Sequence, residues 1–236
     1  MDEVRVALLG GFECASAGVR IALPLGAQRL LALLALRGGM NRAAAGECLW
    51  PDSTRGRAAA NLRSALWRGR QIGDVTLIDR ANPRLQLAPT IGIDLQELMS
   101  RVRGIRGSAR RSPATSGWES MVDALSRDLL PDWCDDWLVL ERERWDQFRL
   151  HALEGLVQQL LGEEQYMAAL QTALVTIAIE PIRETAHRLV IELHIAEGNG
   201  ASALRHYQRY RGLLQRELGV APSKRMDQLV RPLMAP

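Results

Sequence analysis

The sequence predicts two folded parts, an α+β part over residues 1–93 and an all-α part over residues 94–236. Short alternating segments and helical segments are mixed in the first part, whereas nearly every segment after Asp94 has helical periodicity. The charge also changes sign along the chain. Seventeen Arg stand against nine Asp or Glu up to Arg111, and 13 basic residues stand against 18 acidic ones from Ser112 onward. A length of 236 residues, of which 47% are apolar, suits two domains with buried cores.

Strands precede helices in the first part. Alternation of apolar and polar residues predicts strands over residues 4–8, 12–14 and 19–23. Apolar residues at helical spacing predict helices over residues 28–37, 42–49 and about 54–71, the second of them capped by Asn41. Two β-like segments, residues 75–78 and 85–87, then flank an Asn-Pro turn. Three helices followed by a β-hairpin are the arrangement of a winged helix-turn-helix, so we expect this fold for residues 1–93.

Helices dominate the second part. Asp94 and Glu97 have the spacing of a capping box and start a helix that we expect to reach about Arg103. Residues 104–117 are rich in Gly, Ser and Arg and predict a flexible loop. Further helices are predicted over residues 118–127, 137–161, 163–178, 181–197, 201–218 and 223–233. Because Ala169-Leu170 recurs as Ala203-Leu204 after 34 residues, we expect these helices to stack as tetratricopeptide-like repeats.

The third helix of the first part carries the strongest functional signal. Leu62, Leu66 and Gly69 share one face, which suits a core. Arg63, Trp67 and Arg70 share another face, with Arg68 beside them. Such a face can enter the major groove of DNA, where arginine binds guanine through two hydrogen bonds. The alternative is an arginine-rich face that is merely solvated, but Arg80 and Arg84 at the tip of the following hairpin favour DNA binding.

Several longer motifs point to a known family. They are Leu49-Trp50, Asn61-Leu-Arg-Ser-Ala-Leu-Trp-Arg68, Leu130-Pro-Asp-Trp133, Asp135-Asp-Trp137, Glu141-Arg-Glu-Arg144, Arg149-Leu-His-Ala-Leu153 and Leu214-Gln-Arg-Glu-Leu-Gly-Val-Ala-Pro222. With them the chain resembles the Streptomyces antibiotic regulatory protein (SARP) family over nearly its whole length. Members of that family join an OmpR-type winged helix to a bacterial transcriptional activator domain. The chain carries no further sensor or ATPase motif and is similar to the small, stand-alone type.

The resemblance implies a set of DNA contacts. Residues in positions that read the major groove are Asn61, Arg63, Ser64, Trp67 and Arg68. Trp50 and Arg70 correspond to contacts with the sugar-phosphate backbone, and Arg80 corresponds to a wing tip that reaches the minor groove. Gly69 departs from the leucine that is usual in this pattern, and glycine in a helix costs about 1 kcal/mol of propensity. We therefore expect the helix to be weakest at this end, next to Arg70.

The resemblance also implies a function and partners. Activation of a secondary-metabolite (antibiotic) biosynthetic gene cluster in an actinobacterium is expected. The protein would bind direct repeats of double-stranded promoter DNA near the −35 element as side-by-side protomers. It would contact the sigma and alpha subunits of RNA polymerase. The alternative hypothesis is a helical-repeat scaffold or adaptor whose winged helix binds protein rather than DNA, which the salt dependence of DNA binding would reveal.

Other classes of protein find little support. The sequence lacks a phosphate-binding loop, a dinucleotide-binding glycine motif and a nucleophile elbow, so we expect neither enzyme activity nor a cofactor. His187 and His194 share a helix face, but the motifs that would complete a metal site are missing. Three widely spaced cysteines, the absence of a signal peptide and the shortness of every apolar run favour a reducing cytoplasm without membrane spans. The tryptophans 118, 133, 137 and 145 are expected to pack in a core, a ligand pocket being the alternative.

Overall fold

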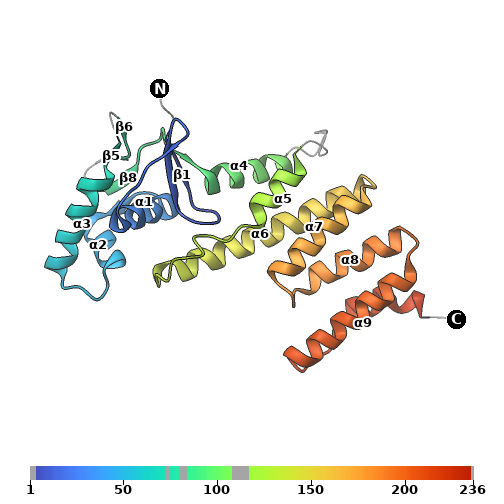
Figure 1. Cartoon of the computed structure of the whole chain (residues 1–236). Coiled ribbons are helices and arrows are strands. Elements are labelled where there is room, and N and C mark those ends of the chain that lie inside the picture. The colour runs from blue at the N-terminus through green and yellow to red at the C-terminus, as the bar shows by residue number, and fades with distance from the viewer. Residues whose placement is uncertain (1–3, 73–74, 80–83, 108–116, 235–236) are drawn as a thin grey trace. The chain divides into compact units, whose positions relative to one another are not determined.

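The structure is a computed structural model that describes residues 4–72, 75–79, 84–107 and 117–234 (Figure 1). It contains two compact units. Unit 1 comprises residues 1–111 and 127–145, and unit 2 comprises residues 112–126 and 146–236. Helix α6 (Trp137–Gly162) contributes its first residues to unit 1 and the remainder to unit 2. Each unit is described by itself below.

A four-stranded sheet opens unit 1. Its strands are β1 (Val4–Ala7), β2 (Glu13–Ser16), β3 (Val19–Arg20) and β9 (Gly92–Ile93), in the order β3-β2-β1-β9. The first three strands, which alternation predicted, pair as antiparallel neighbours, whereas β9 joins β1 in parallel through the pairing of Val6 with Ile93. Val4, Val6 and Cys14 are buried, so one face of the sheet lies against the core.

Three helices follow the antiparallel strands: α1 (Leu25–Arg37), α2 (Arg42–Leu49) and α3 (Arg55–Gly69). Helix α1 starts at Leu25, three residues earlier than expected, because Pro24 supplies the fixed backbone angle that can precede a helix. The Asn41 cap is confirmed, since its side chain accepts a hydrogen bond from the Ala43 N–H at 2.9 Å. Leu30, Leu31 and Leu34 of α1 are buried where α1 packs on α3.

Short strands complete the winged part. They are β4 (Met40–Asn41), β5 (Gln71–Ile72), β6 (Val75–Thr76), β7 (Ile78–Asp79) and β8 (Arg84–Leu87). Antiparallel pairing of β7 with β8 forms the expected hairpin, whose residues 80–83 lie outside the described residues. Met40 pairs with Leu85, so β8 is also fastened to the short strand before α2. The hairpin therefore rests directly on the helical part of the fold.

Helix α4 (Asp94–Gly107) ends later than expected. Residues 104–107 are helical and not part of a loop, while residues 108–116 of the expected loop lie outside the described residues. The Asp94 carboxylate accepts hydrogen bonds from the N–H groups of Leu95, Leu8 and Leu9. This side chain therefore caps its own helix and also holds the end of β1, although burial raises its pKa.

Residues 127–145 are built into unit 1. The Leu130 N–H donates to the Leu8 carbonyl at 2.9 Å, and the Gly10 N–H donates to the Asp128 carbonyl at 2.8 Å. From α6, the Arg142 guanidinium donates hydrogen bonds to the carbonyls of Leu129 and Trp133, at 3.0 and 2.6 Å. The chain after Ser126 therefore pairs with residues 8–10, directly after β1.

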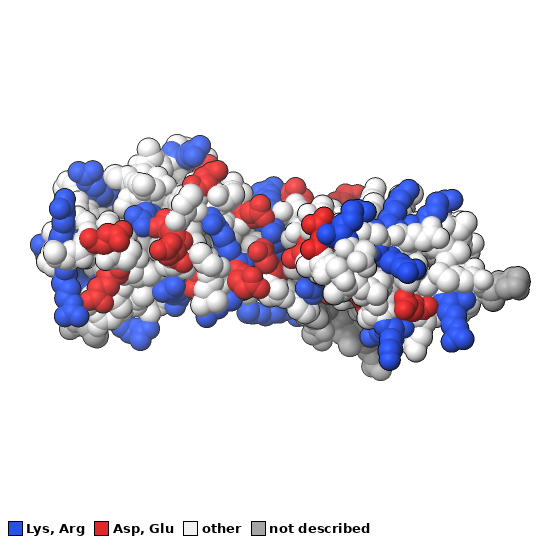
Figure 2. All heavy atoms as spheres, turned by 90° about the horizontal axis from the view of Figure 1, so that it is seen from below, with Lys and Arg blue, Asp and Glu red and all other residues white. Residues whose placement is uncertain are grey.

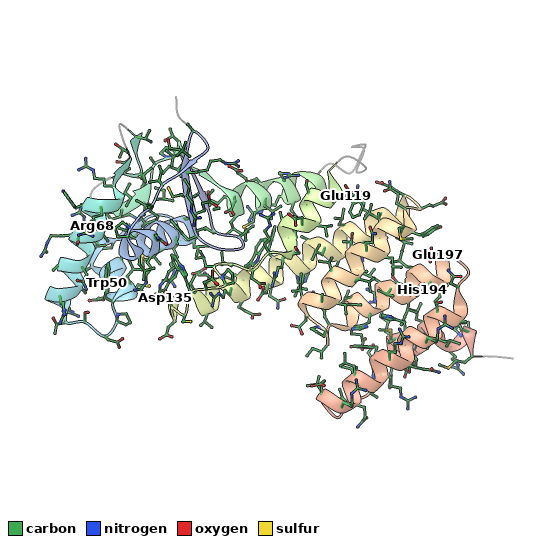
Figure 3. All side chains as sticks on the ribbon, viewed as in Figure 1. Trp50, Arg68, Glu119, Asp135, His194 and Glu197 are labelled. Carbon is green, nitrogen blue, oxygen red and sulfur yellow. The ribbon has the colours of Figure 1, made fainter. Side chains whose placement is uncertain are left out.

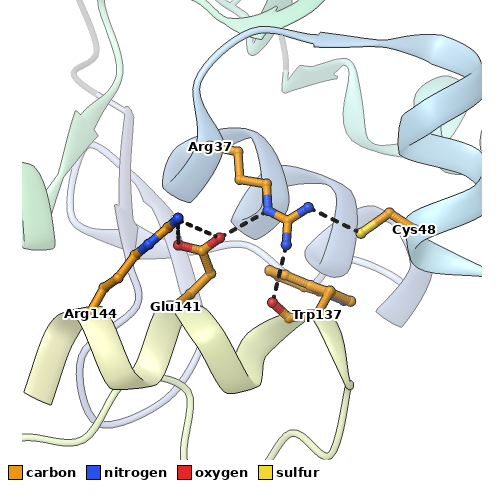
Figure 4. A network of polar contacts seen from close by, with 5 residues as sticks. All are labelled: Arg37, Cys48, Trp137, Glu141 and Arg144. Carbon is orange, nitrogen blue, oxygen red and sulfur yellow. Dashed lines mark hydrogen bonds and ion pairs between the residues drawn. The ribbon is translucent and has the colours of Figure 1, made fainter.

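A polar network joins α6 to α1 (Figure 4). The Glu141 carboxylate, only 6% exposed, accepts from Arg37 Nε at 2.9 Å and from Arg144 Nη1 at 3.1 Å. Arg37 also donates to the Trp137 carbonyl at 3.3 Å. Removing one member would leave a buried charge without compensation, so this network holds the start of α6 firmly in unit 1. Trp137 and Trp145 are buried there, and Trp133 stacks on Phe12.

Unit 2 consists of helices in its described part. They are α5 (Trp118–Ser126), the rest of α6, α7 (Tyr166–Ile179), α8 (Glu184–Ala196), α9 (Gly200–Glu217), α10 (Lys224–Val230) and a 3₁₀ turn (Arg231–Leu233). Helix α8 starts at Glu184 and not at Pro181, which lies in the preceding turn. Helices α7 and α9 begin at Tyr166 and Gly200, 34 residues apart, as the repeat predicted.

The repeated helices pack in sequence order. Helix α7 packs on α8 and α8 on α9, while Ala169 and Ala203, at matching repeat positions, are both fully buried. The last core cluster contains Ile191, Tyr207, Tyr210, Leu214 and Met226. Small residues at the repeat position let neighbouring helices approach closely, which is how stacked helix pairs bury a continuous core. Within the described ranges, no helix is long and apolar enough to cross a membrane.

Candidate nucleic-acid interface

Helix α3 is positioned by one buried face. Thr54 caps its start by accepting from the Arg57 N–H at 3.4 Å. The buried residues are Ala58, Leu62, Ala65, Leu66 and Gly69. They repeat every three or four positions, so a single side of the helix packs on α1 and α2. The opposite side is left to solvent.

The exposed side of α3 gathers most of the predicted site residues. Arg63, Ser64, Trp67 and Arg68 are all exposed, and Trp67 is 82% exposed. Their spacing of three and four residues places them on one face of the helix. Figure 3 shows Arg68 projecting outward from α3. This face can offer guanidinium donors and a flat aromatic surface to a partner that enters alongside it.

Asn61 and Arg70 lie at the margins of this face. Asn61 is half-buried, and Arg70 is the residue at which α3 ends. The Arg70 carbonyl accepts from the Leu77 N–H at 2.7 Å, so the backbone at this end is tied to the strands that follow. Arg70 is therefore held at a fixed place although α3 ends beside it.

The structure explains why residue 69 is glycine, which the sequence alone did not. A Cβ atom at position 69 would lie 2.8 Å from the Cβ of Ala27 in α1. Real Cβ atoms do not approach so closely, so a leucine at position 69 would force α1 and α3 apart. Helix α3 ends at Gly69 with Arg70 as its C-cap, two residues before the expected end at about residue 71.

Trp50 lies at the end of α2, away from the α3 face. It is half-buried, and its backbone N–H donates to the Gly46 carbonyl at 3.0 Å. The ring lies against the start of α1, since a Cβ on Gly26 would be 3.7 Å from Trp50 Cζ2. Trp50 thus combines a packed ring with a partly accessible edge.

The hairpin contributes one described arginine. Arg84 is exposed in β8, and its guanidinium donates to the Gly39 carbonyl. It is the first residue of β8, directly after residues 80–83, and its backbone pairs with Asn41 of β4. Arg80, the predicted wing-tip residue, lies outside the described residues.

Further basic residues surround α3. Arg57 is exposed in the first turn of α3, and its spacing of seven and 11 residues to Ser64 and Arg68 puts it on the same face. Sequence analysis did not single out Arg57, although this spacing was visible. Figure 2 shows Lys and Arg gathered at the end of unit 1 where α2 and α3 lie. The exposed arginines that the structure describes there are Arg42, Arg55, Arg57, Arg63 and Arg68.

Only one of these arginines has a recorded ion pair, between Arg55 and Glu47 at 3.3 Å. That pair is strongly exposed and leaves Arg55 able to exchange partners. The described residues contain no group of three His, Cys, Asp or Glu that could hold a metal ion. The surface is therefore suited to bind a polyanion by charge and hydrogen bonding.

Comparisons with known proteins give this fold and surface a context. The family described as "Bacterial transcriptional activator domain" matches residues 93–233, which is more than half of the chain. The chain therefore belongs to the bacterial transcriptional activator domain family. The resemblance to the SARP family found in the sequence motifs is thereby confirmed.

One solved structure supports the same architecture. EmbR of Mycobacterium tuberculosis, solved in complex with a low-affinity phosphopeptide, matches with a TM-score of 0.79 at 17% sequence identity. The match covers 99% of this chain and 65% of the EmbR chain, so this chain spans about two thirds of EmbR. At this identity the likeness shows the fold, which confirms the predicted winged helix followed by a helical domain. No curated protein sequence matches the chain.

Proposed function

We propose that the protein is a sequence-specific, DNA-binding transcriptional activator that reads promoter DNA with α3. The observation that carries the proposal is the exposed face of α3, where the indole of Trp67 is 82% exposed between Arg63 and Arg68. At this exposure the flat face of the indole and its N–H are both available to a partner. Flanking guanidinium groups make DNA a suitable partner.

Each residue has a proposed role. Arg63 and Arg68 bind base edges, assisted by Asn61, Ser64 and Trp67, while Trp50, Arg57 and Arg70 contact the sugar-phosphate backbone. Arg80 reaches the minor groove from the wing, and Arg84 links the start of β8 to Gly39 and adds positive charge. The DNA-reading part ends at residue 93 and the activator part begins at Asp94, where α4 starts.

The finer features of the proposal rest on the family resemblance. The protein would bind direct repeats beside the −35 element as side-by-side protomers and recruit RNA polymerase through its sigma and alpha subunits. Its target would be a secondary-metabolite gene cluster in an actinobacterium, and it would act in the cytoplasm. Neither catalysis nor a cofactor has a role in this mechanism.

A footprint of the purified full-length protein on promoters near its own gene tests the proposal. We expect protection of a direct repeat that weakens steeply between low and moderate salt, because each neutralised phosphate releases a counterion. A folded protein that protects no DNA at either salt concentration would support the helical-repeat scaffold instead.

A matched pair of variants tests the assignment of α3. Arg68→Ala should weaken specific binding by roughly 5- to 150-fold, the range expected for the loss of a bidentate base contact worth about 1–3 kcal/mol. Arg101→Ala removes the same charge from an exposed position on α4 and should have a much smaller effect. Equal affinities of the two variants in a gel-shift titration would contradict the assignment.

A further inference from the structure

Two of the three cysteines border one cavity in unit 1. The cavity has a volume of about 430 Å³ and lies between the end of α2 and the segment that leads into α6. Its lining includes Cys48 and Cys134, together with Trp50, Arg29, Asp135 and Trp137. Figure 3 labels Trp50 and Asp135, which mark the two walls. The third cysteine, Cys14, is buried in β2 and does not border the cavity.

The two thiols differ in access. Cys134 is exposed and lies in residues 131–136, which form neither helix nor strand. Cys48 is half-buried in the last turn of α2. Its sulfur accepts a hydrogen bond from Arg37 Nη1 at 3.6 Å (Figure 4). Cys134 is thus the thiol that a small oxidant in solution reaches first.

Charges around the cavity link the two positions. Burial raises the pKa of the Cys48 thiol, Arg37 and Arg29 lower it, and Asp135 raises it again. Asp135 is the residue next to Cys134 and forms an ion pair with Arg29. The ion pair of Arg29 and Asp135 therefore acts on the Cys48 thiol. The neighbouring Arg37 stabilises a thiolate at Cys48 once one forms, although burial keeps this sulfur mostly protonated at rest.

We propose that Cys48 and Cys134 form a peroxide-sensitive thiol pair that closes into a disulfide across this cavity. In the first step the Cys134 thiolate attacks hydrogen peroxide, the O–O bond breaks, and Cys134 becomes a sulfenic acid while hydroxide leaves and is protonated to water. In the second step the Cys48 thiolate attacks the sulfenic sulfur, the S–O bond breaks, the S–S bond forms and a second water leaves. In total, two thiols and one peroxide give one disulfide and two waters.

The cross-link would join parts of the chain that are far apart in sequence. A disulfide needs Cα atoms within about 7 Å of each other, and the irregular segment 131–136 is the wall that can adjust. The bond would fasten this segment to α2 and close the cavity beside Trp50. Oxidation would thereby fix one arrangement of residues 127–145 on the winged helix.

Peptide mapping of the full-length protein tests the pair directly. The reduced protein is diluted, treated with hydrogen peroxide, alkylated in denaturant and digested without reductant. We expect one linked peptide pair that contains Cys48 and Cys134, and an alkylated Cys14. In Cys48→Ser we expect a dimedone-trapped sulfenic acid at Cys134, whereas in Cys134→Ser the Cys48 thiol should stay reduced. Cys14→Ser serves as the matched control and should retain the linked pair.

Other outcomes would overturn the proposal. One is a protein in which Cys48 stays alkylatable while Cys134 proceeds to sulfinic acid. Another is a disulfide found only between the Cys134 residues of two copies. Because both readouts are covalent and need no DNA, they are independent of the proposed function in transcription.

Discussion

Gly69 shows how one missing side chain can decide the packing of two helices. Glycine inside a helix ordinarily costs about 1 kcal/mol relative to alanine, so replacing it usually stabilises a protein. Here the added methyl group would meet Ala27 at 2.8 Å. The steric cost therefore outweighs the gain in propensity.

We expect Gly69→Ala to lower the free energy of unfolding by about 1–3 kcal/mol, the usual cost of overpacking. Gly56→Ala, in the same helix, is the control, because nothing lies within 4 Å of its added Cβ. Thermal unfolding followed by circular dichroism compares the two variants. A Gly69→Ala protein at least as stable as the Gly56→Ala protein would show that α1 and α3 can move apart freely.

Two turns of unit 2 share a backbone conformation but place different residue types at the position with positive φ. Glu164 and Gly198, 34 residues apart, both have positive φ angles, of 58° and 75°. After each, a backbone N–H reaches back five residues to the helix before it, from Gln165 to Leu160 at 2.9 Å and from Asn199 to His194 at 2.7 Å. Glycine is the most favourable residue at this helix end, because other residues are strained at positive φ.

Exchanging the residue types at these turns should therefore have opposite effects. Glu164→Gly should raise the free energy of unfolding by about 1 kcal/mol, and Gly198→Ala should lower it by a similar amount. Urea denaturation of both variants measures the difference. If Glu164→Gly lowers the free energy of unfolding, contacts of the Glu164 side chain stabilise the protein by more than the backbone strain costs.

At the scale of elements, a histidine pair joins α8 to α9. His187 Nε2–H donates to the Pro181 carbonyl at 2.8 Å, which leaves its Nδ1 to accept from His206 Nε2–H at 3.0 Å. The His187 ring also stacks on Tyr210. This arrangement requires the His187 ring to be neutral, because its Nδ1 must accept a hydrogen bond. Burial lowers the pKa of His187, while burial and the nearby His187, His194 and Arg209 lower the pKa of His206 to about 4.

The pair should make unit 2 sensitive to acid. An unfolded histidine titrates near about 6.5, so between that pH and about 4 the unfolded state binds more protons than the folded state. The stabilising contribution is complete above about pH 6.5 and is lost as the pH falls through this window. Denaturation at pH 7.5 and pH 5 should show the loss. His206→Gln should reduce it, and His151→Gln, at an exposed position on α6, should not. If His206→Gln loses as much free energy of unfolding between pH 7.5 and pH 5 as the unmodified protein, the assignment to this histidine pair is contradicted.

The elements differ in how well the sequence predicts them. Helix α2 and its Asn41 cap follow from local signals, and so do the strands β1 to β3. Strands β4 and β9 were missed because each has two residues and exists only through pairing with a partner distant in sequence. The end of α4 was misplaced because glycine within residues 104–107 suggested a loop, although the helix continues there.

The candidate site shows the same limit. The exposed face of α3 could be found from spacing alone, since Arg63, Trp67 and Arg68 recur at helical intervals. Neither the close approach of Gly69 to Ala27 nor the hydrogen bond from Arg84 to the Gly39 carbonyl could be found this way. Both depend on how separate elements meet, which no local pattern encodes.

At the scale of the molecule, the compact units do not follow sequence order. Residues 127–145 belong to unit 1, where they hold Leu8 through the backbone and Arg37 through Glu141. No local feature of residues 127–145 predicts that they belong to unit 1, because their apolar and charged side chains would equally suit a helical repeat. A winged helix that ends at residue 93 or 111 therefore lacks part of its own packing.

A fragment of residues 1–111 should unfold at a lower temperature than unit 1 in the full chain, since it exposes the surface that residues 127–145 cover. Adding a synthetic peptide of residues 127–145 should raise that temperature, because the peptide restores the bonds to Leu8 and Arg37. Calorimetry with and without the peptide, and with a scrambled peptide as control, makes the comparison. Identical transitions in all three samples would mean that the segment contributes no stability.

The exposed ring of Trp67 also has an optical consequence. The other five tryptophans are half-buried or buried, so Trp67 is the fluorophore whose emission is reddest and whose lifetime acrylamide shortens most. The part of the emission that acrylamide quenches would therefore report mainly on a single position on α3. The unlabelled protein thus has an intrinsic fluorophore on the surface that we assign to DNA binding.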